Sequence, residues 1–230
     1  MMIQRLVGHN IHKFDLPYLI RASIYNKVEV PQYLLPFGGR FQRFDSYSID
    51  TMQMVGAGEW GYLLKLETAA MACGMSYGKT GSGKNFYLMS RDEQEEYLKQ
   101  DLLMTQHLYK NISHAFGYEY EPIIFDIETM PKSETAIEMI APKFDPDSVA
   151  IGNLKDPEKV EAKINAAEDS HLSKIMDKAG LHAHYSDPCA IGYIIGGEVR
   201  MDFHEPKELL TRFWEVASSV WGNNQKLGDH

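Results

Sequence analysis

The sequence contains few cysteines, no long apolar run and no excess of positive charge. Two cysteines among 230 residues exclude a disulfide scaffold and fit a reducing compartment, with room for one bridge at most. No stretch approaches the roughly 18–20 apolar residues of a membrane span, and residues 1–12 lack the apolar core of a signal peptide. We therefore expect an intracellular, cytoplasmic protein that has no membrane partner.

The shortage of positive charge also limits the partners. A net charge of −9 argues against a general polyanion-binding protein. It is compatible with a nucleic-acid enzyme, because bound divalent metals and a local basic groove can outweigh the net charge. What the sequence does have is 44% hydrophobic residues in a chain of 230, which is enough for one α/β domain with a core.

The stretch IIFDIET, residues 123–129, predicts a buried strand that ends in two acids. Alternate side chains of a strand share a face, so Asp126 and Glu128 would point the same way. Two carboxylates on one face repel each other, and divalent cations between them would make the arrangement favourable. The alternative is a strand end whose acids simply face solvent.

A third acid follows a second short strand. Leu6 and Val7 indicate the end of a buried strand, and apolar residues at helical spacing begin after Asp15. Asp15 alone could be a plain N-cap. The longer string GHNIHKFD, which includes Asn10 and Phe14, is much more specific than the acid by itself.

Residues 90–108 give the strongest helix signal in the chain. Ser90 precedes Glu93 in a capping box, and acids fill the first turn. Tyr97 and Asp101 are four residues apart and so lie on one face, one turn apart. As an isolated pair they could equally belong to a protein surface.

The remaining chain gives mostly structural signals. Residues 26–58 read as irregular, and there Asp45 and Asp50 are secondary acid candidates for which structural or capping roles are favoured. His182 and His184 could ligate a metal, but no further ligand stands at metal-site spacing. Regular patterns predict a helix at residues 65–73 and an amphipathic helix at residues 207–220. Between them, residues 190–203 predict a hairpin whose turn consists of two glycines.

The segment GKTGSGKN, residues 78–85, matches the G-x-x-x-x-G-K pattern of a phosphate-binding loop. However, Asn85 stands where that loop has Ser or Thr, and the preceding segment predicts a helix rather than a buried strand. We therefore favour a flexible basic loop whose Lys79 and Lys84 touch phosphates. Nucleotide hydrolysis at this segment is a distant alternative.

Taken together, the three acidic motifs resemble those of the DEDD 3′–5′ exonucleases, in their tyrosine subclass (DEDDy). The likeness is to the exonuclease domain of family B DNA polymerases, and more closely to stand-alone, phage-type exonucleases. It covers most of the chain and is thinnest in residues 132–186. The motifs D-x-E, N-x-x-x-F-D and Y-x-x-x-D fall on Asp126 and Glu128, on Asn10, Phe14 and Asp15, and on Tyr97 and Asp101.

The resemblance implies an α/β, ribonuclease H-like fold, a mixed central sheet flanked by helices, in a single exonuclease domain of residues 1–230. The motif order departs from the family: here the second and third motifs precede the first, so the chain looks circularly permuted. Residues 1–111 hold the second and third motifs, residues 112–121 would form the joining loop, and residues 122–230 hold the first motif, an insertion and the hairpin. Ten residues span at most about 33–36 Å. If that is too short, two chains could complete each other's sites.

The resemblance also implies a two-metal-ion hydrolysis that releases nucleoside monophosphates from the 3′ ends of single-stranded or frayed DNA. Tyr97 would orient the attacking water. Two Mg²⁺ or Mn²⁺ ions would be held by Asp15, Asp101, Asp126 and Glu128. The nucleic acid would be contacted by Asn10, Phe14, Thr129, Lys79 and Lys84.

Two other functions stay open at this point. The same site could trim RNA, or the chain could be a non-catalytic, nucleic-acid-binding accessory module; the intact set of five motif residues argues against the latter. No polymerase domain fits in the chain, so a proofreading role would require a separate polymerase or replication protein. The likeness to phage-type exonucleases extends the expected location to the cytoplasm of a host cell.

Overall fold

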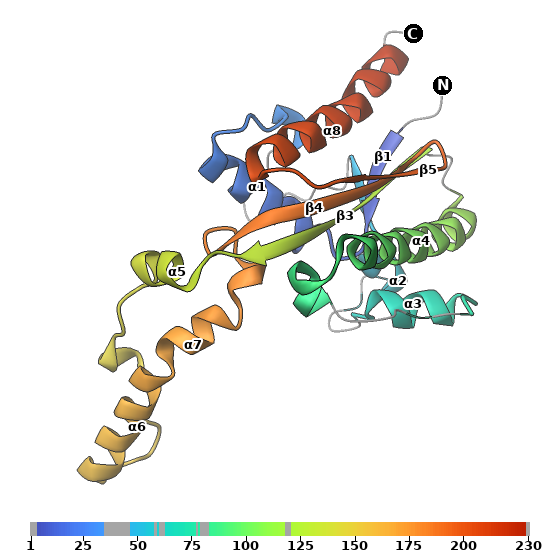
Figure 1. Cartoon of the computed structure of the whole chain (residues 1–230). Coiled ribbons are helices and arrows are strands. Elements are labelled where there is room, and N and C mark those ends of the chain that lie inside the picture. Colours follow the sequence, from blue (N-terminus) through green and yellow to red (C-terminus); the bar gives the residue numbers. More distant parts are fainter. Residues whose placement is uncertain are drawn as a thin grey trace. The chain divides into compact units, whose positions relative to one another are not determined.

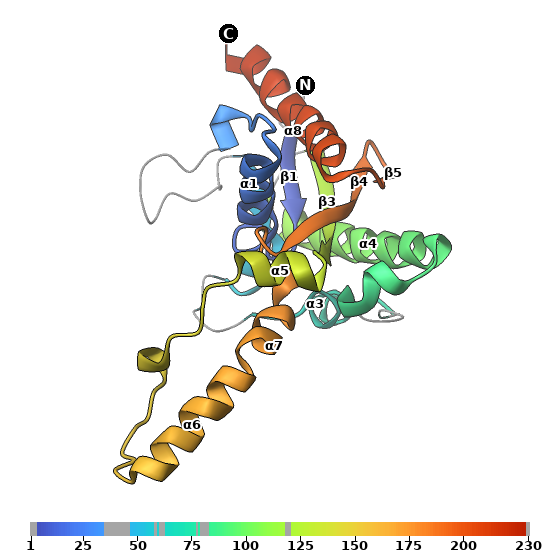
Figure 2. The ribbon, with the colours of Figure 1, turned by 60° about the vertical axis from the view of Figure 1, so that its left-hand side comes forward.

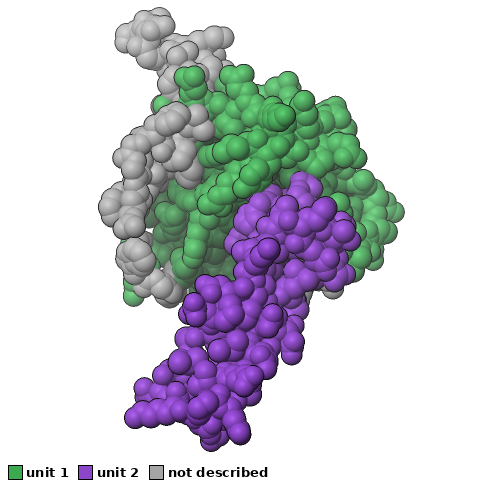
Figure 3. Space-filling view, turned by 90° about the vertical axis from the view of Figure 1, so that its left-hand side faces the viewer, with its two compact units in different colours: residues 1–130, 188–230 green, residues 131–187 purple. Residues whose placement is uncertain are grey.

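The computed structural model describes residues 4–34, 47–57, 59, 63–76, 78, 83–117 and 121–228. The chain divides into two compact units, residues 1–130 with 188–230 and residues 131–187, which Figure 3 shows in two colours. The second unit coincides with the region where the likeness to the exonucleases is thinnest. That it is an insertion in a single domain stays a prediction.

The first unit is built on a mixed five-stranded sheet of order β2-β1-β3-β4-β5 (Figure 1). β1 runs parallel to both β2 and β3, whereas β4 and β5 are antiparallel. The prediction of an α/β chain with a mixed sheet is confirmed. The strands are β1 (Gln4–Gly8), β2 (Ser48–Asp50), β3 (Glu121–Pro131), β4 (Ser186–Ile195) and β5 (Glu198–Asp202).

Helices flank this sheet on both faces. The helices α1 (Asp15–Asn26) and α8 (Pro206–Gly228) pack together on one face, and α4 (Arg91–Phe116) lies on the other (Figures 1 and 2). Two short helices, α2 (Thr51–Val55) and α3 (Leu66–Ala72), pack against α4. The described residues of the first unit also form the 3₁₀ turns η1 (Gln32–Leu34) and η3 (Gly83–Leu88).

Alternate residues of the central strand β3 are buried under different helices. Ile124 belongs to the cluster that includes Leu102 of α4. The next residue, Phe125, contacts Phe213 of α8, with ring centroids 5.1 Å apart. The alternation of the strand therefore assigns Asp126 to the face that α4 covers.

A glycine of β4 lets α4 lie close to the sheet. A Cβ added at Gly192 would stand 2.8 Å from both Leu98 Cγ and Leu102 Cδ1. A branched or longer residue there would push α4 outward, because well-packed interiors tolerate extra atoms poorly. Since Tyr97 and Asp101 neighbour these leucines in sequence, the same contact fixes how far these two residues stand from the strands.

Most of the predicted elements are confirmed. The hairpin turns at Gly196 and Gly197, whose φ angles of +58° and +84° suit a two-residue turn. The helix expected at residues 65–73 is α3, and the helix expected at residues 207–220 is α8. The apolar face predicted for α8 is buried, namely Leu209, Leu210, Phe213, Trp214 and Ala217.

Two predictions about connecting segments are wrong. Residues 26–58 are not irregular throughout, because β2 and α2 form within them. Residues 112–116 are not part of a joining loop, because α4 continues to Phe116 and ends at Gly117, which has a left-handed φ of +66°. The connection to β3 is therefore shorter than the ten residues expected.

The second unit is small and mostly helical. Asp156 caps its longest helix through a hydrogen bond from the backbone N–H of Glu158, and Pro157 occupies the first helical position, where its missing N–H costs little. A small core gathers Ile137, Ala179 and Tyr185. Its helices and turns are α5 (Glu134–Ile140), η4 (Pro146–Ser148), α6 (Pro157–Asp169), α7 (His171–Met176) and η5 (Ala179–Leu181). Among the described helices of the whole chain, none is both long and apolar enough to cross a membrane.

Candidate metal centre

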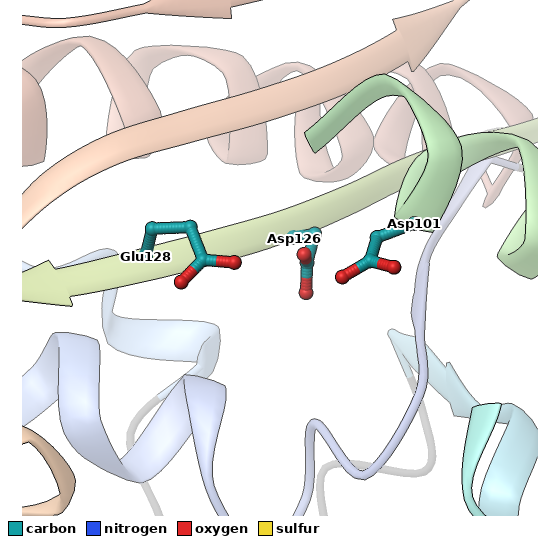
Figure 4. Close-up of side chains that lie close together, drawn as sticks. All are labelled: Asp101, Asp126 and Glu128. Atoms are coloured by element: carbon teal, nitrogen blue, oxygen red, sulfur yellow. The ribbon is translucent and has the colours of Figure 1, made fainter. Parts of the chain in front are cut away.

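Three acids of the first unit bring their carboxylate oxygens together. Asp101, Asp126 and Glu128 each offer one oxygen, and these three atoms all lie within 4.8 Å of one another. Figure 4 shows Asp126 and Glu128 projecting from β3, and Asp101 projecting from α4, towards a common space. Asp101 is 4% exposed, and the two β3 acids are half-buried.

This donor set fits a divalent cation. Three carboxylates so close together repel one another, and the repulsion is stronger than in water because the site is partly buried. Mg²⁺ takes oxygen ligands at about 2.0–2.1 Å, so two oxygens on opposite sides of one ion stand about 4 Å apart. The observed spacing needs only small side-chain movements to reach that geometry. Oxygen-only ligands favour Mg²⁺ or Mn²⁺ over softer metals.

The start of α4 is fixed by local sequence. The Ser90 side chain accepts a hydrogen bond from the Glu93 N–H at 3.4 Å, and the Glu93 carboxylate accepts one from the Ser90 N–H at 2.8 Å. The predicted capping box is therefore confirmed. Because the helix begins at a defined residue, Tyr97 and Asp101 face the sheet one turn apart, as predicted.

Tyr97 stands beside the acids. Its side chain is 6% exposed. The position that a Cβ of Gly83 would occupy lies 2.9 Å from Tyr97 Oη and 3.6 Å from Glu128 Oε2. The phenol oxygen and the Glu128 carboxylate thus border the same space at Gly83, which places the tyrosine at the edge of the carboxylate group.

Asp15 does not belong to the group of three. It is the first residue of α1, and Phe14 occupies the N-cap position, so interpreting Asp15 as the N-cap is wrong. Asp15 is 4% exposed. Burial raises the pKa of Asp15 to about 7, a hydrogen bond to its own backbone N–H lowers the pKa in part, and nearby Asp50 raises it further.

The loop that leads to Asp15 leaves the sheet beside β3. Val7 pairs with Ile124 in the parallel register of β1 and β3. A Cβ added at Gly8 would lie 3.1 Å from the carbonyl oxygen of Phe125. The carboxyl end of β1 therefore lies beside the middle of β3, and the chain after Gly8 starts out next to the position where β3 reaches Asp126.

Asp50 holds that loop in place. One of its carboxylate oxygens, Oδ1, accepts the backbone N–H groups of Asn10 at 2.8 Å and Met52 at 3.0 Å, and the other, Oδ2, accepts that of His12 at 3.1 Å. Asp50 is 2% exposed and is the N-cap of α2, so the favoured structural and capping role is confirmed. Asn10 has a left-handed φ of 70°, a conformation that asparagine adopts more readily than most residues. Asp45 lies outside the described residues.

The predicted nucleic-acid contacts are placed only in part. The half-buried ring of Phe14 contacts the ring of Tyr18, with centroids 5.7 Å apart. Thr129 is half-buried and follows Glu128 on β3, so the alternation of the strand turns it to the other face. Lys79 and the side chain of Lys84 lie outside the described residues. The contacts of all these residues with nucleic acid stay predictions.

Cys189 is a neighbour of the site that the sequence does not reveal. Burial raises the pKa of its thiol to about 12, and the nearby carboxylate of Glu128 raises it further. A thiol with so high a pKa stays protonated near neutral pH and is a poor nucleophile. Its strand, β4, is far from the motifs in sequence, so no spacing signal could have linked it to them.

The two other ligand-binding interpretations gain no support. Among the described elements, the helix α3 precedes the segment GKTGSGKN, and the 3₁₀ turn η3 begins at Gly83, within the segment. A nucleotide-binding loop instead follows a strand and leads into an α-helix, and the described elements here do not have that order. The rings of His182 and His184 lie 5.6 Å apart. Within the described ranges, these histidines are not part of any group of three metal-ligating side chains.

Comparison of the chain with protein-family models, with curated proteins and with solved structures finds no match.

Proposed function

We propose that this chain is a metal-dependent 3′–5′ exonuclease that releases nucleoside monophosphates from DNA 3′ ends. The observation that supports the proposal is the meeting of Asp101, from the Y-x-x-x-D motif on α4, with Asp126 and Glu128, from the D-x-E motif on β3. The two motifs lie on different elements and still bring their oxygens within 4.8 Å of one another. This arrangement disfavours the alternative that Asp126 and Glu128 are a pair of acids that simply face solvent, because such a pair would not require a third carboxylate from another element.

Asp101, Asp126 and Glu128 would hold Mg²⁺ or Mn²⁺, and Asp15 would approach from the loop beside β3. When bound, such ions lower the pKa of water and stabilise the charge on the leaving 3′ oxygen. Tyr97, whose hydroxyl borders the same space at Gly83 as the Glu128 carboxylate, would orient the attacking water as a hydrogen-bonding group. A phenol near its ordinary pKa is a poor general base, so orientation is the role that its chemistry favours.

Asn10 and Phe14 would contact the terminal nucleotides, because they lie in the loop between β1 and α1 that leads to Asp15. Phe14 would stack on a base, and stacking is tolerant of sequence. A site of this kind recognises the backbone and unpaired bases, so single-stranded or frayed DNA is the proposed substrate. A polymerase or replication protein would have to be a separate partner.

We also propose a ribonuclease H-like fold in permuted order. The acidic strand β3 lies at the centre of the sheet, between the parallel strands β1 and β2 and the hairpin β4–β5. In both ribbon views, β1 begins and α8 ends at the same end of the first unit (Figures 1 and 2). This proximity supports a join between those segments in an unpermuted relative.

A degradation assay tests the proposed function. Single-stranded DNA labelled at its 5′ end is incubated with the protein and Mg²⁺ or Mn²⁺, and the products are resolved at single-nucleotide steps. We expect a ladder that shortens from the 3′ end and disappears with EDTA or with Asp126→Asn. The matched control is Glu95→Gln, which removes the charge of an exposed acid on α4 and should leave the ladder unchanged.

Two outcomes would contradict the proposal. One is a folded wild-type protein that degrades neither DNA nor RNA; the other is degradation that Asp126→Asn does not reduce. An RNA substrate of the same sequence shows whether the enzyme prefers ribose or deoxyribose. Faster degradation of the RNA would favour the exoribonuclease alternative at the same site.

A further inference from the structure

The 3₁₀ turn η3, at the end of the glycine- and lysine-rich segment, packs directly on Tyr97. Phe86 of this turn is fully buried, and its ring meets the Tyr97 ring edge-on with centroids 5.9 Å apart. The side-chain amide of Gln94 donates a hydrogen bond to the carbonyl oxygen of Phe86 at 3.0 Å, which ties η3 to α4. Leu98 and Ala190 complete the cluster around the tyrosine. The ring of Tyr97 is therefore held on several sides.

The first residue of η3 approaches the hydroxyl end of the same tyrosine. A Cβ added at Gly83 would lie 2.9 Å from Tyr97 Oη and 3.5 Å from Tyr97 Cζ. The distance of 2.9 Å between the added Cβ and Tyr97 Oη is shorter than the contact distance of an unstrained carbon–oxygen pair. Because the phenol oxygen is bonded rigidly to a buried ring, either the whole Tyr97 side chain would have to tilt slightly or the backbone of η3 would have to shift.

The same position borders the carboxylate group. The added Cβ would stand 3.6 Å from Glu128 Oε2, which is ordinary contact distance. A side chain at residue 83 would thus press on the phenol and touch the carboxylate without clashing with it. The tyrosine hydroxyl is the group whose position depends on residue 83.

We propose that Gly83 is a positioning residue for Tyr97. Its bare backbone leaves room for the hydroxyl end of the phenol, and Phe86 packs on the ring of the same rigid side chain, so together they set where the hydroxyl stands relative to Glu128. This inference rests on the proposed nuclease function and adds to it a residue outside the three acidic motifs. It also gives the glycine-rich segment a role that does not require nucleotide binding.

A double-mutant cycle tests the inference. We compare kcat and KM on single-stranded DNA for wild type, Gly83→Ala, Tyr97→Phe and the double variant. A misplacement of about 1 Å can cost about 100-fold in rate, so a smaller shift in Gly83→Ala is expected to lower kcat about tenfold with KM nearly unchanged. In the Tyr97→Phe background the same change should have no further effect, because the hydroxyl it displaces is absent.

Gly78→Ala is the matched control. It makes the same substitution in the same segment, but the three atoms nearest to the added Cβ all belong to the side chain of Glu67, and the nearest is a carboxylate oxygen at its flexible end. We expect wild-type kcat for this variant. Equal kcat values for Gly83→Ala and Gly78→Ala would overturn the inference. So would an equal loss from Gly83→Ala in the wild-type and Tyr97→Phe backgrounds.

Thermal unfolding of the four proteins keeps the test decisive if Gly83→Ala folds poorly. Removing the hydroxyl should relieve the contact, so Tyr97→Phe should restore part of the stability that Gly83→Ala loses. Absence of that rescue would also overturn the inference. An inactive but folded wild type would instead count against the proposed function itself, which keeps the two failures apart.

Discussion

Two buried acids, Asp50 and Asp15, lie near the carboxyl ends of β1 and β2, and their surroundings separate their roles. Asp50 accepts three backbone N–H groups and is satisfied within the protein. Asp15 is buried beside it with a pKa raised to about 7, first through burial. A carboxyl group that is costly to ionise in the metal-free protein is one that a bound cation would stabilise.

The raised pKa of Asp15 gives a prediction about stability without metal. The unfolded chain loses this proton near pH 3.8, and the folded chain loses it near pH 7. Between those values the folded state binds more protons, so the Asp15 contribution to the free energy of unfolding falls as the pH rises. Relative to wild type, Asp15→Asn should gain roughly 2–4 kcal/mol of stability between pH 4 and pH 8.

Urea denaturation in EDTA at several pH values measures this difference. Any constant cost of the substitution cancels, because only the change with pH is compared. Asp92→Asn, which alters an exposed acid of α4, should run parallel to wild type across the range. A parallel profile for Asp15→Asn would contradict the assignment of the raised pKa.

At the scale of elements, the features predicted from sequence are those with local causes. The capping box of α4, the two glycines between β4 and β5 and the apolar face of α8 each depend on residues close together in the chain. The strand β2 has no such local signal, because it has three residues and its pairing comes from β1, far away in sequence. Tertiary pairing decides such short strands, and local propensity does not.

For the candidate site too, the sequence predicts the local arrangement of residues within each element but not the packing between elements. Alternation along β3 predicts that Asp126 and Glu128 share a face, and helical spacing predicts that Tyr97 and Asp101 do. Neither pattern says that α4 covers that face, which depends on packing such as the close contact at Gly192. The contact of Gly83 with Tyr97 also has no sequence signal, because any loop can contain a glycine.

At the scale of the whole molecule, one chain brings the motifs together despite their order. α4 ends at Phe116 and β3 begins at Glu121, and the acids of both elements meet within the same first unit. A second chain is therefore not required to bring these three acids together.

A mixing experiment tests this conclusion. Asp101→Asn and Asp126→Asn proteins are combined after joint unfolding and refolding, and nuclease activity is measured on single-stranded DNA. If each chain builds its own site, every site in the mixture contains one substitution and activity should stay at the level of the separate variants. Recovery of about a quarter or more of wild-type activity would show that chains exchange halves.

Mn²⁺ binding tests whether Asp101, Asp126 and Glu128 hold a divalent cation, as their geometry suggests. The free Mn²⁺ signal is followed by electron paramagnetic resonance during titration into metal-free wild type, Asp126→Asn and Glu95→Gln. The structure predicts that wild type and Glu95→Gln remove Mn²⁺ from solution and that Asp126→Asn binds it at least about tenfold more weakly, since carboxylate charge dominates such sites. Equal binding by all three proteins would contradict the metal site, and with it the proposed nuclease.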